Sequence, residues 1–244
     1  MPAVDSARAP GYVLCETIHK DTGRQGIVRK VPESTVSRLS LYVRLLGELQ
    51  AEGVATLSSE ELAQRCGTTA AQVRKDLSFF GTFGKRGLGY SVAELGAALR
   101  SILGLERRWR VALVGAGRIG MALLGYQDFR RQGFHIEAVF DADPAKVGLE
   151  LLGLTVQSAE MMDHALAESA IDIVIIATPG DAAQRVVDRV LAAGVRAILN
   201  FAPVKLDVPP GVALKNVNMA VELEALSFAL ANANRRPRRT PPRS

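Results

Sequence analysis

Hydrophobic residues recur every three or four positions soon after the start of the chain. Val36, Leu39, Val43 and Leu46 fall on one stripe of a helical projection, and Gly53 follows them. This spacing predicts an amphipathic helix from about residue 34, and the glycine after the last apolar position predicts its end. Residues 1–31 show no sustained periodicity, so we predict a flexible extension there.

Two shorter helices are predicted directly afterwards. Ser58 is followed three positions later by Glu61, which is the pattern of a capping box at the start of a helix. Thr68 or Thr69 can cap a third helix, which continues to about residue 80. A helix, a second helix, a tight turn and a third helix make up a helix-turn-helix unit.

The third helix carries two different faces. Val73, Leu77 and Phe80 lie on its apolar face. The remaining arc is polar and holds Gln72, Arg74, Lys75 and Ser78. In the major groove of DNA, cations contact phosphate or guanine and an amide can read adenine. Asp76 lies beside them, where it can accept a hydrogen bond from a cytosine amine or hold one of the two cations in place. The alternative is an ordinary solvated basic face.

A glycine-rich segment follows the third helix. The sequence GTFGKRGLGY, residues 81–90, places Lys85 and Arg86 between glycines. Glycines permit the positive φ of tight turns, so the segment predicts a β-hairpin wing with long cations at its tip. An arginine there suits a narrow minor groove. An ordinary surface hairpin is the alternative, but the position directly after a helix-turn-helix unit favours a winged-helix DNA-binding domain.

The second half of the chain begins with a different glycine-rich loop. The apolar residues 111–114 run into Gly115-x-Gly117-x-x-Gly120 and then into a helical pattern. In this strand–loop–helix context the spacing is typical of dinucleotide binding. The first glycine permits the turn, the second lets the backbone approach a pyrophosphate, and the third lets helix and strand pack.

An acidic residue ends the next predicted strand. Asp141 stands 21 residues after Gly120, at the end of HIEAVFD. An acid at that place accepts hydrogen bonds from the adenosine ribose and repels a 2′-phosphate, which favours NAD(H) over NADP(H). Lys146 lies close enough to weaken this preference slightly. A Rossmann domain for another nucleotide, such as coenzyme A, is the alternative.

Strands and helices continue to alternate after Asp141. IDIVIIATPG is a buried strand that ends at Thr178-Pro179, DAAQRVVDRVLAAG is a helix, and VRAILNFAP is another strand. The alternation predicts a doubly wound parallel sheet. The predicted fold class is therefore α/β, with an N-terminal winged helix-turn-helix domain followed by a Rossmann domain.

Composition and charge fit two compact domains and a polyanionic partner. The chain has 244 residues, 48% of them hydrophobic, and no apolar run reaches the ~20 residues of a membrane span. Residues 1–110 contain 16 Lys/Arg against 11 Asp/Glu, a net +5, whereas residues 111–234 contain 9 against 14, a net −5. The last ten residues add five arginines. A basic front half favours DNA as its partner, although solvated surface charge gives the same count.

A cytoplasmic protein without a metal site is expected. The N-terminal residues contain no apolar core of signal-peptide length. Cys15 and Cys66 lie far apart, without the spacing of metal ligands. Free thiols in a reducing compartment follow from this usage.

Catalysis is not expected. His19 lies in the extension, His135 opens a strand and His164 lies on a helix that reads as surface. A dehydrogenase needs a general acid or base and a substrate domain, and the residues after the Rossmann pattern are too few for one. A bound nicotinamide with no substrate acts as a signal. The competing hypothesis is a small NAD-dependent oxidoreductase with an appended helical domain.

A last helix is predicted near the C-terminus. Met219, Leu223, Leu226 and Leu230 recur at helical spacing. This stripe can fold back onto its own Rossmann domain. It can equally form a dimer contact, since winged helices usually read two half-sites through two-fold symmetry.

Taken together, these stretches resemble the Rex family of redox-sensing transcriptional repressors. The matching segments lie between residues 31 and 230, in the family's order: VPESTVSRLSLYVRLL, QVRKDLSFFGTFGKRGLGY, VGAGRIGMALLGY, FDADPAKVG, ILNFAPV and AVELEALSF. The resemblance implies a homodimer that binds a palindromic operator when NADH is low and leaves it when NADH binds, while NAD⁺ leaves it competent for DNA. It also implies that the terminal helix is exchanged between subunits.

Patterns and resemblance together divide the chain. We expect a flexible N-terminal extension (1–31), a winged-helix DNA-binding domain (32–107), a Rossmann NAD(H)-binding domain (108–215), an exchanged C-terminal helix (216–233) and a basic disordered tail (234–244).

The same comparison assigns candidate residues to two ligands. For operator DNA they lie at the helix starts, on the third helix and in the wing: Ser58, Thr69, Gln72, Arg74, Lys75, Asp76, Lys85 and Arg86. For NADH and NAD⁺ they lie in the second glycine loop and at the ends of the following strands: Gly115, Ala116, Gly117, Arg118, Ile119, Gly120, Tyr126, Asp141, Lys146, Thr178 and Pro179.

One switch position departs from the family pattern. The resemblance implies that a tyrosine, an arginine and an acid rearrange with redox state. Tyr126 and Arg44 fill the first two positions, but Asn218 stands where the acid is expected. Because asparagine cannot form an ion pair with Arg44, we expect altered discrimination between NADH and NAD⁺.

Overall fold

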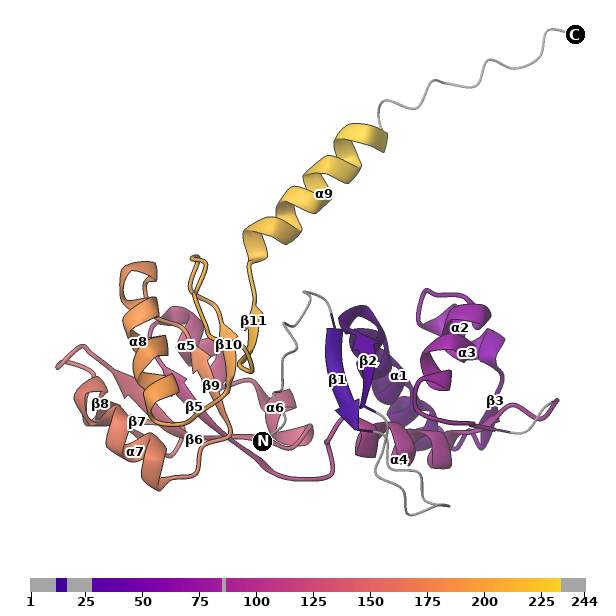
Figure 1. The fold of residues 1–244 in the computed structure, drawn as a ribbon, viewed down its shortest axis with the longest axis horizontal. Coiled ribbons are helices and arrows are strands. Elements are labelled where there is room, and N and C mark those ends of the chain that lie inside the picture. Colours follow the sequence, from indigo (N-terminus) through magenta and orange to yellow (C-terminus); the bar gives the residue numbers. More distant parts are fainter. Residues whose placement is uncertain (1–11, 17–27, 85–86, 234–244) are drawn as a thin grey trace, which may run out of the picture. The chain divides into compact units, whose positions relative to one another are not determined.

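The computed structural model describes residues 12–16, 28–84 and 87–233. The chain divides into two compact units, Met1–Arg108 and Trp109–Ser244. Figure 1 shows a largely helical first unit and a second unit built around a sheet.

The first unit is a helical cluster with short strands. Its elements are, in order, β1 (Tyr12–Glu16), β2 (Val28–Pro32), α1 (Glu33–Ala51), β3 (Thr56–Leu57), α2 (Ser59–Arg65), α3 (Ala70–Ser78), β4 (Tyr90–Ser91) and α4 (Val92–Ile102). The helices share one core, in which Leu39, Leu46, Leu62, Val73 and Leu99 are almost completely buried. Burial of these apolar side chains, spaced at helical intervals, holds the helices together.

Two strands lie in the segment predicted as a flexible extension. β1 pairs antiparallel with β2, from Tyr12 opposite Pro32 to Glu16 opposite Val28. The prediction missed this ladder because strand pairing depends on a partner segment, which local periodicity does not reveal. Residues 1–11 and 17–27 of this segment lie outside the described residues.

The predicted wing also differs in its pairing. β4 pairs antiparallel with β3, placing Leu57 opposite Tyr90 and Thr56 opposite Ser91. Residues 81–84 and 87–88 form turns and irregular backbone, and Gly89 forms a single β-bridge directly before β4. The strand that pairs with β4 therefore comes from before α2 and not from the glycine-rich segment. Leu57 and Tyr90, which face each other in this pair, are both buried in the core of the first unit. Lys85 and Arg86, the predicted wing tip, lie outside the described residues.

The second unit contains a sheet of seven strands in the order β11-β10-β9-β5-β6-β8-β7. The strands are β5 (Trp109–Val114), β6 (Phe134–Asp141), β7 (Glu150–Leu151), β8 (Leu154–Ser158), β9 (Ile173–Ile176), β10 (Ala197–Asn200) and β11 (Ala213–Asn216). All neighbours pair in parallel except β7 with β8. This is the doubly wound sheet that the alternating pattern predicted.

Helices cover both faces of that sheet. They are α5 (Arg118–Leu124), α6 (Gln127–Arg131), η1 (Ala159–Met161), α7 (Met162–Glu168) and α8 (Gly180–Ala192). Along β5, Ala112 and Val114 belong to the core shared with α7 and α8, whereas Val111 and Leu113 belong to the core beneath α5 and α6. Successive strand residues point to opposite faces, so a continuous apolar strand serves both cores.

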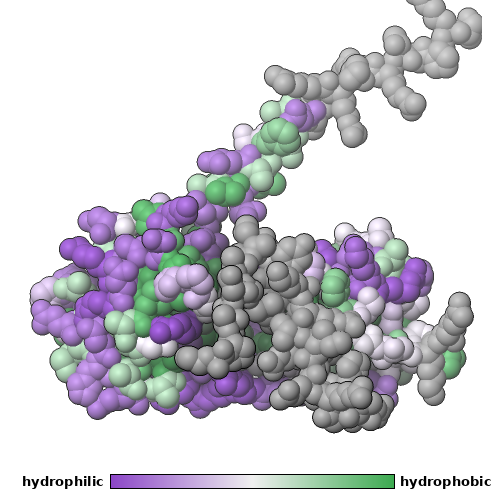
Figure 2. All heavy atoms as spheres, in the orientation of Figure 1, coloured by the Kyte–Doolittle hydropathy of each residue, from purple (hydrophilic) through white to green (hydrophobic). Residues whose placement is uncertain are grey.

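The last helix is exposed along its length. α9 (Met219–Ala233) carries Leu223, Leu226, Phe228 and Leu230 with exposed fractions between 60% and 73%. Figure 2 shows hydrophobic side chains along this helix. An apolar helix that leaves these side chains exposed among the described residues needs another partner to be stable in water.

Candidate functional site

Side chains cap the helices of the predicted DNA-binding surface. The Ser58 hydroxyl accepts a hydrogen bond from the Glu61 N–H at 3.1 Å, and the Glu61 carboxylate accepts one from the Ser58 N–H at 2.7 Å. This is the predicted capping box. At α3, the Thr69 hydroxyl accepts from the Gln72 N–H at 3.2 Å. Both hydroxyls therefore fix helix starts, and as candidate DNA contacts they have their acceptor capacity partly in use.

The two cations of α3 differ in their surroundings. Arg74 donates to the Ser59 hydroxyl at 2.7 Å and to the Glu60 carboxylate at 3.2 Å. With side-chain exposures of 55% and 68%, the Arg74–Glu60 ion pair contributes little to stability but directs the guanidinium toward α2. Lys75 and Ser78 are exposed, and the Ser78 hydroxyl donates to the carbonyl of Lys75.

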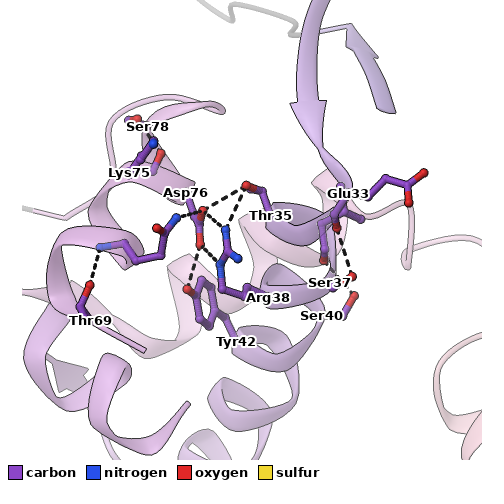
Figure 3. A network of polar contacts seen from close by, with 12 residues as sticks. Glu33, Thr35, Ser37, Arg38, Ser40, Tyr42, Thr69, Lys75, Asp76 and Ser78 are labelled. Carbon is purple, nitrogen blue, oxygen red and sulfur yellow. Dashed lines mark hydrogen bonds and ion pairs between the residues drawn. The ribbon is translucent and has the colours of Figure 1, made fainter. Parts of the chain in front are cut away.

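Asp76 occupies a different place from the one expected for a base contact. It is completely buried, and its carboxylate accepts hydrogen bonds from Arg38, Thr35, Tyr42 and Gln72 (Figure 3). Sequence analysis left open a contact with cytosine or a hold on Arg74 or Lys75. The structure instead joins Asp76 to α1 through Arg38, with the closest nitrogen–oxygen distance at 2.6 Å.

The electrostatics of Asp76 favour its charged form. Burial alone raises the pKa of a carboxyl group. Hydrogen bonds from Arg38, Gln72 and Tyr42 outweigh burial and bring the pKa of Asp76 below its ordinary value. Burial is the main reason that the pKa of the Tyr42 hydroxyl is raised, and the hydrogen bond to the Asp76 carboxylate raises it further. The cluster therefore holds one ionised acid, one guanidinium and neutral donors.

The α1 members of this cluster were missed by sequence analysis. Thr35, Arg38 and Tyr42 lie three to four residues apart, so they share one face of α1. That spacing, with a hydroxyl, a cation and a phenol on the buried side of a helix, was the available signal. The spacing does not indicate that Asp76 is their partner, because Asp76 lies more than thirty residues away along the chain.

The second glycine loop forms the predicted turn after β5. Gly115 has φ of +101°, a conformation that L side chains rarely adopt, and its N–H donates to the Phe140 carbonyl at 2.8 Å. A Cβ at Gly120 would collide with the Gly115 carbonyl oxygen. A Cβ at Gly117 would meet nothing within 4 Å. Contacts within the chain explain why glycine is needed at the first and third positions. The second glycine borders open space, where the protein backbone can approach a bound ligand.

Asp141 sits at the end of β6 against this loop. Its carboxylate accepts from the Ala116 N–H at 2.7 Å and from the Asp143 N–H at 2.8 Å, and it pairs with the Lys146 ammonium at 3.1 Å. Burial raises the pKa of Asp141, but these backbone and lysine contacts outweigh it and lower the pKa below its ordinary value. An ionised acid, as predicted for ribose binding, stands at this edge.

Eight of the eleven predicted nucleotide residues line one cleft of about 890 Å³. It lies at the carboxyl ends of β5 and β9, where the strand order changes direction and ligands of such sheets bind. Its lining includes Gly115, Gly117, Arg118, Ile119, Asp141, Lys146, Thr178 and Pro179. Ala116 and Gly120 belong to the same glycine loop and are buried, but they do not line the cleft. Sequence analysis did not assign the other eight lining residues to the ligand: Val114, Ala142, Asp143, Ala159, Ala177, Asp181, Ala182 and Val186.

Thr178 carries a polar atom that lacks a partner. Its Oγ1 is buried and makes no hydrogen bond within the described chain. A buried hydroxyl without a partner costs free energy unless a ligand or water supplies one. Together with the open space at Gly117, this atom fits a dinucleotide lying across the cleft.

Tyr126 lies outside that cleft. It directly precedes α6 and lines a separate hollow of about 460 Å³ together with Phe129, whose ring stands edge-on to it at a centroid distance of 5.0 Å. Tyr126 is half exposed. The structure therefore does not bring this predicted cofactor residue together with the glycine loop.

The other two switch candidates lie in different units. Arg44 is exposed on α1. Asn218 is exposed directly before α9, where its side-chain oxygen accepts from the Ala220 N–H at 3.0 Å and so caps the helix.

Other classes of site receive no support from the described part of the chain. Among residues 12–16, 28–84 and 87–233, no group of three or more His, Cys, Asp or Glu side chains could hold a metal ion. The same residues include no helix both long and apolar enough for a bilayer crossing.

Comparisons with known proteins agree with both units. A family model described as "Putative DNA-binding protein N-terminus" matches residues 30–78, and one described as "CoA binding domain" matches residues 106–204. The protein named "Redox-sensing transcriptional repressor Rex" of Syntrophomonas wolfei is 48% identical over 208 residues, which cover 85% of this chain and 99% of that protein.

Solved structures of a Rex-family repressor, RSP, match the same length of chain. RSP in complex with NAD⁺ and operator DNA is 39% identical, with a TM-score of 0.80, and the match covers 84% of this chain and 94% of RSP. RSP in complex with NADH is 36% identical, with a TM-score of 0.76, covering 84% of this chain and 96% of RSP.

Proposed function

This chain belongs to the Rex family of redox-sensing transcriptional repressors, and from that premise we propose that it binds palindromic operator DNA and is released when NADH binds. The first unit supplies the DNA-binding surface of α2, α3 and the segment that follows them. The second unit supplies the dinucleotide cleft. NADH and NAD⁺ act as regulatory ligands that are not consumed.

The cleft after β5 and β9 is the observation that carries this proposal. Gly117 borders open space, Asp141 is ionised at the far edge, and Thr178 has a buried hydroxyl without a partner. A pyrophosphate at the loop, a ribose at Asp141 and a nicotinamide near Thr178 would satisfy all three. Coenzyme A is the alternative ligand class, and it is disfavoured because its 3′-phosphate would approach the Asp141 carboxylate.

The redox response follows from the charge of the nicotinamide ring. NADH has a neutral ring, whereas the NAD⁺ ring is cationic, and a desolvated apolar pocket admits a neutral ring at lower cost. When NADH prefers the arrangement that does not fit DNA, each ligand must weaken the other by the same factor. A hundredfold coupling corresponds to about 2.7 kcal/mol, which one charged contact and some packing can supply.

The exposed helix α9 fits a homodimer with exchanged helices. Its leucines and Phe228 are exposed along the helix, and a palindromic operator requires two copies of α3 related by two-fold symmetry. Exchange of α9 between two copies would bury this apolar surface and link the two DNA-binding domains.

Catalysis is not part of the proposed function. The competing hypothesis was a small NAD-dependent oxidoreductase, and its nearest requirement is a general acid or base beside the nicotinamide. Asp181 lines the cleft three residues after Thr178 and could act as such a group, so the choice against catalysis rests on membership of a family of transcriptional repressors. The proposed location is the cytoplasm, where operator DNA and the dinucleotide pool are both accessible.

A gel-shift titration tests the proposal directly. The full chain is mixed with a palindromic A·T-rich duplex at fixed salt, with increasing NADH in one series and increasing NAD⁺ in another. We expect NADH to release the duplex at concentrations where NAD⁺ does not. Equal retention of the duplex in saturating NADH and in none would overturn the proposed function.

Separate variants distinguish DNA contact from folding damage. Lys75→Ala changes an exposed side chain on α3, so we expect operator affinity to fall while NADH affinity stays at the wild-type value. Arg86→Ala, in the segment outside the described residues, is expected to behave in the same way. A parallel loss of NADH affinity would point to misfolding instead.

Asn218 is proposed to change the discrimination between the two dinucleotides. Its side chain caps α9 and cannot carry the negative charge expected there from the family resemblance. Operator release is titrated with NADH and with NAD⁺ in the wild type and in Asn218→Asp. Because aspartate also caps helices well, a change in the ratio of the two midpoints reports on charge. Identical curves would refute a role for this position.

A further inference from the structure

Gln72 is tied to Asp76 in a way that fixes the direction of its amide group. The Gln72 Nε2 donates to Asp76 Oδ1 at 2.8 Å, one turn along α3. An ionised carboxylate can only accept hydrogen bonds. The amide must therefore turn its nitrogen toward Asp76, and the opposite orientation would place two oxygen acceptors against each other.

Four further hydrogen bonds hold the carboxylate that directs Gln72. Its Oδ1 also accepts from the Thr35 hydroxyl at 3.1 Å and from Arg38 at 2.8 Å. Its Oδ2 accepts from Arg38 at 2.6 Å and from the Tyr42 hydroxyl at 3.0 Å. These donors all belong to α1, and Figure 3 shows them converging on Asp76 from that helix. Asp76 is thus a fixed acceptor beneath the polar face of α3.

Gln72 stands where recognition helices contact bases. It lies in the first turn of α3, and its side chain is only partly buried. In helix-turn-helix proteins the N-terminal residues of the recognition helix, which is α3 here, reach base edges in the major groove. With one N–H held by Asp76, the amide keeps its oxygen and its second N–H for a ligand. An adjacent acceptor and donor on glutamine match the N6 and N7 edge of adenine.

From this geometry we propose that Asp76 is a positioning residue that presets the Gln72 amide to read an adenine in each operator half-site. The inference rests on the proposed function, because it needs operator DNA as the ligand. An amide free to flip can present either atom at a given point and tolerates several bases. A preset amide discriminates between them, by roughly tenfold for one good bidentate contact.

The test measures base preference and not affinity alone. The preferred operator is first selected from random duplexes with the wild-type chain in the absence of NADH. Each half-site position is then changed in turn, and affinities are compared at one salt concentration. We expect one adenine per half-site whose replacement weakens wild-type binding about tenfold but has little effect on Gln72→Ala.

Asp76→Asn is the decisive variant. Asparagine can rotate to offer its own N–H₂ group, so the Gln72 amide is free to flip, and preference at that adenine should fall to about twofold or less. The double variant Asp76→Asn, Gln72→Ala should show no further loss of preference. Asp76→Asn with unchanged preference at every position would overturn the proposal.

Two further variants keep the test valid when Asp76→Asn does not fold. Gln72→Glu changes a partly exposed residue, places a carboxylate beside Asp76 and removes the donor, so the adenine preference should vanish. Leu95→Ala removes core packing from α4 of the same unit. It should lower the melting temperature and leave base preference intact, which separates positioning from general destabilisation.

The outcomes also separate this inference from the proposed function. A wild-type chain that selects no duplex at all contradicts the proposed function. The wild-type chain can instead select an operator while Gln72→Ala and Gln72→Glu lose the same affinity for every operator variant. That result contradicts only the role of Gln72 and Asp76.

Discussion

The three glycines of the loop after β5 face three different surroundings. Gly115 needs its positive φ, and Gly120 needs the space that a methyl group would fill against the Gly115 carbonyl. Gly117 needs neither, because its φ of −81° suits alanine and a methyl group added there would meet no atom of the chain. What a glycine contributes at this position concerns the ligand and not the fold.

Gly117→Ala should therefore separate ligand binding from stability. We expect the melting temperature to stay at the wild-type value and the NADH affinity, measured by fluorescence titration, to fall at least about tenfold, or 1.4 kcal/mol. Gly120→Ala is the matched control and should lower the melting temperature. Normal NADH binding by Gly117→Ala would contradict a pyrophosphate at this loop.

Thr178→Val tests the buried hydroxyl in the cleft. Valine has nearly the same shape, so the ligand-free chain should keep its free energy of unfolding or gain up to about 1 kcal/mol. NADH affinity should fall by about tenfold when the hydroxyl bonds the ligand. Urea unfolding and NADH titration measure the two effects. Thr155→Val, at an exposed position of β8, serves as the control, and equal NADH affinity in all three proteins would remove Thr178 from the site.

At the scale of elements, α1 and α3 are joined through one buried carboxylate. Asp76 belongs to α3, and its partners Thr35, Arg38 and Tyr42 belong to α1. Breaking a buried ion pair by removing one partner costs about 3–5 kcal/mol, and the partial exposure of Arg38, at 26%, reduces that cost. The helix that is proposed to read DNA is therefore held by the helix that carries Arg44.

This pairing predicts a specific dependence of stability on pH. The pKa of Asp76 is lower in the folded chain than the ordinary value of about 3.9 in the unfolded chain. The stabilisation is thus fully present above about pH 4 and is lost as the pH falls through the folded value. Urea unfolding of the full chain between neutral and acid pH, followed by helical circular dichroism, should show this loss.

Asp76→Asn provides the comparison for that titration. The variant should be less stable than the wild type at pH 7, and its free energy of unfolding should fall less steeply in acid because one titrating group is gone. Parallel curves for the two proteins would mean that Asp76 titrates alike in the folded and unfolded chains, contrary to its hydrogen bonds.

At the scale of the whole molecule, α9 decides whether one copy or two make the functional unit. Leu226→Lys with Leu230→Lys places two charges on its exposed apolar face. We expect the mass in analytical ultracentrifugation to fall from dimer to monomer. Operator affinity should fall about a hundredfold or more, because two linked half-site contacts become independent.

The control for α9 is another exposed apolar residue of the same unit. Met161, on η1, is 57% exposed, and Met161→Lys should leave mass and operator affinity unchanged. A double leucine variant that remains dimeric would contradict the exchange of α9.

Prediction from sequence succeeded where a feature depends on neighbouring residues. The capping box of Ser58 and Glu61 formed as expected, since both partners lie within one helical turn. The strand before Gly115 and the acid at the end of β6 also stand where the spacing placed them. Rossmann spacing is local in the same sense, because a strand, a turn and a helix follow one another directly along the chain.

The features that sequence analysis missed depend on distant partners. β4 pairs with β3 across more than thirty residues, so the wing prediction had no means of finding that ladder. Tyr126 lies two residues past the end of α5, yet the fold directs it to a hollow beside Phe129 and not to the cleft. The position of a residue along the chain does not reveal where its side chain points once a helix such as α5 has ended.

By itself the sequence determined the helix-turn-helix layout, the glycine loop with Asp141 and the apolar stripe of α9, because periodicity, capping and turn chemistry act over a few residues. Only the tertiary structure decided that Asp76 is a buried anchor and not an exposed base contact. An aspartate on a polar arc reads the same in both cases. Burial is set by what packs against it, and here Thr35, Arg38 and Tyr42 reach it from another helix.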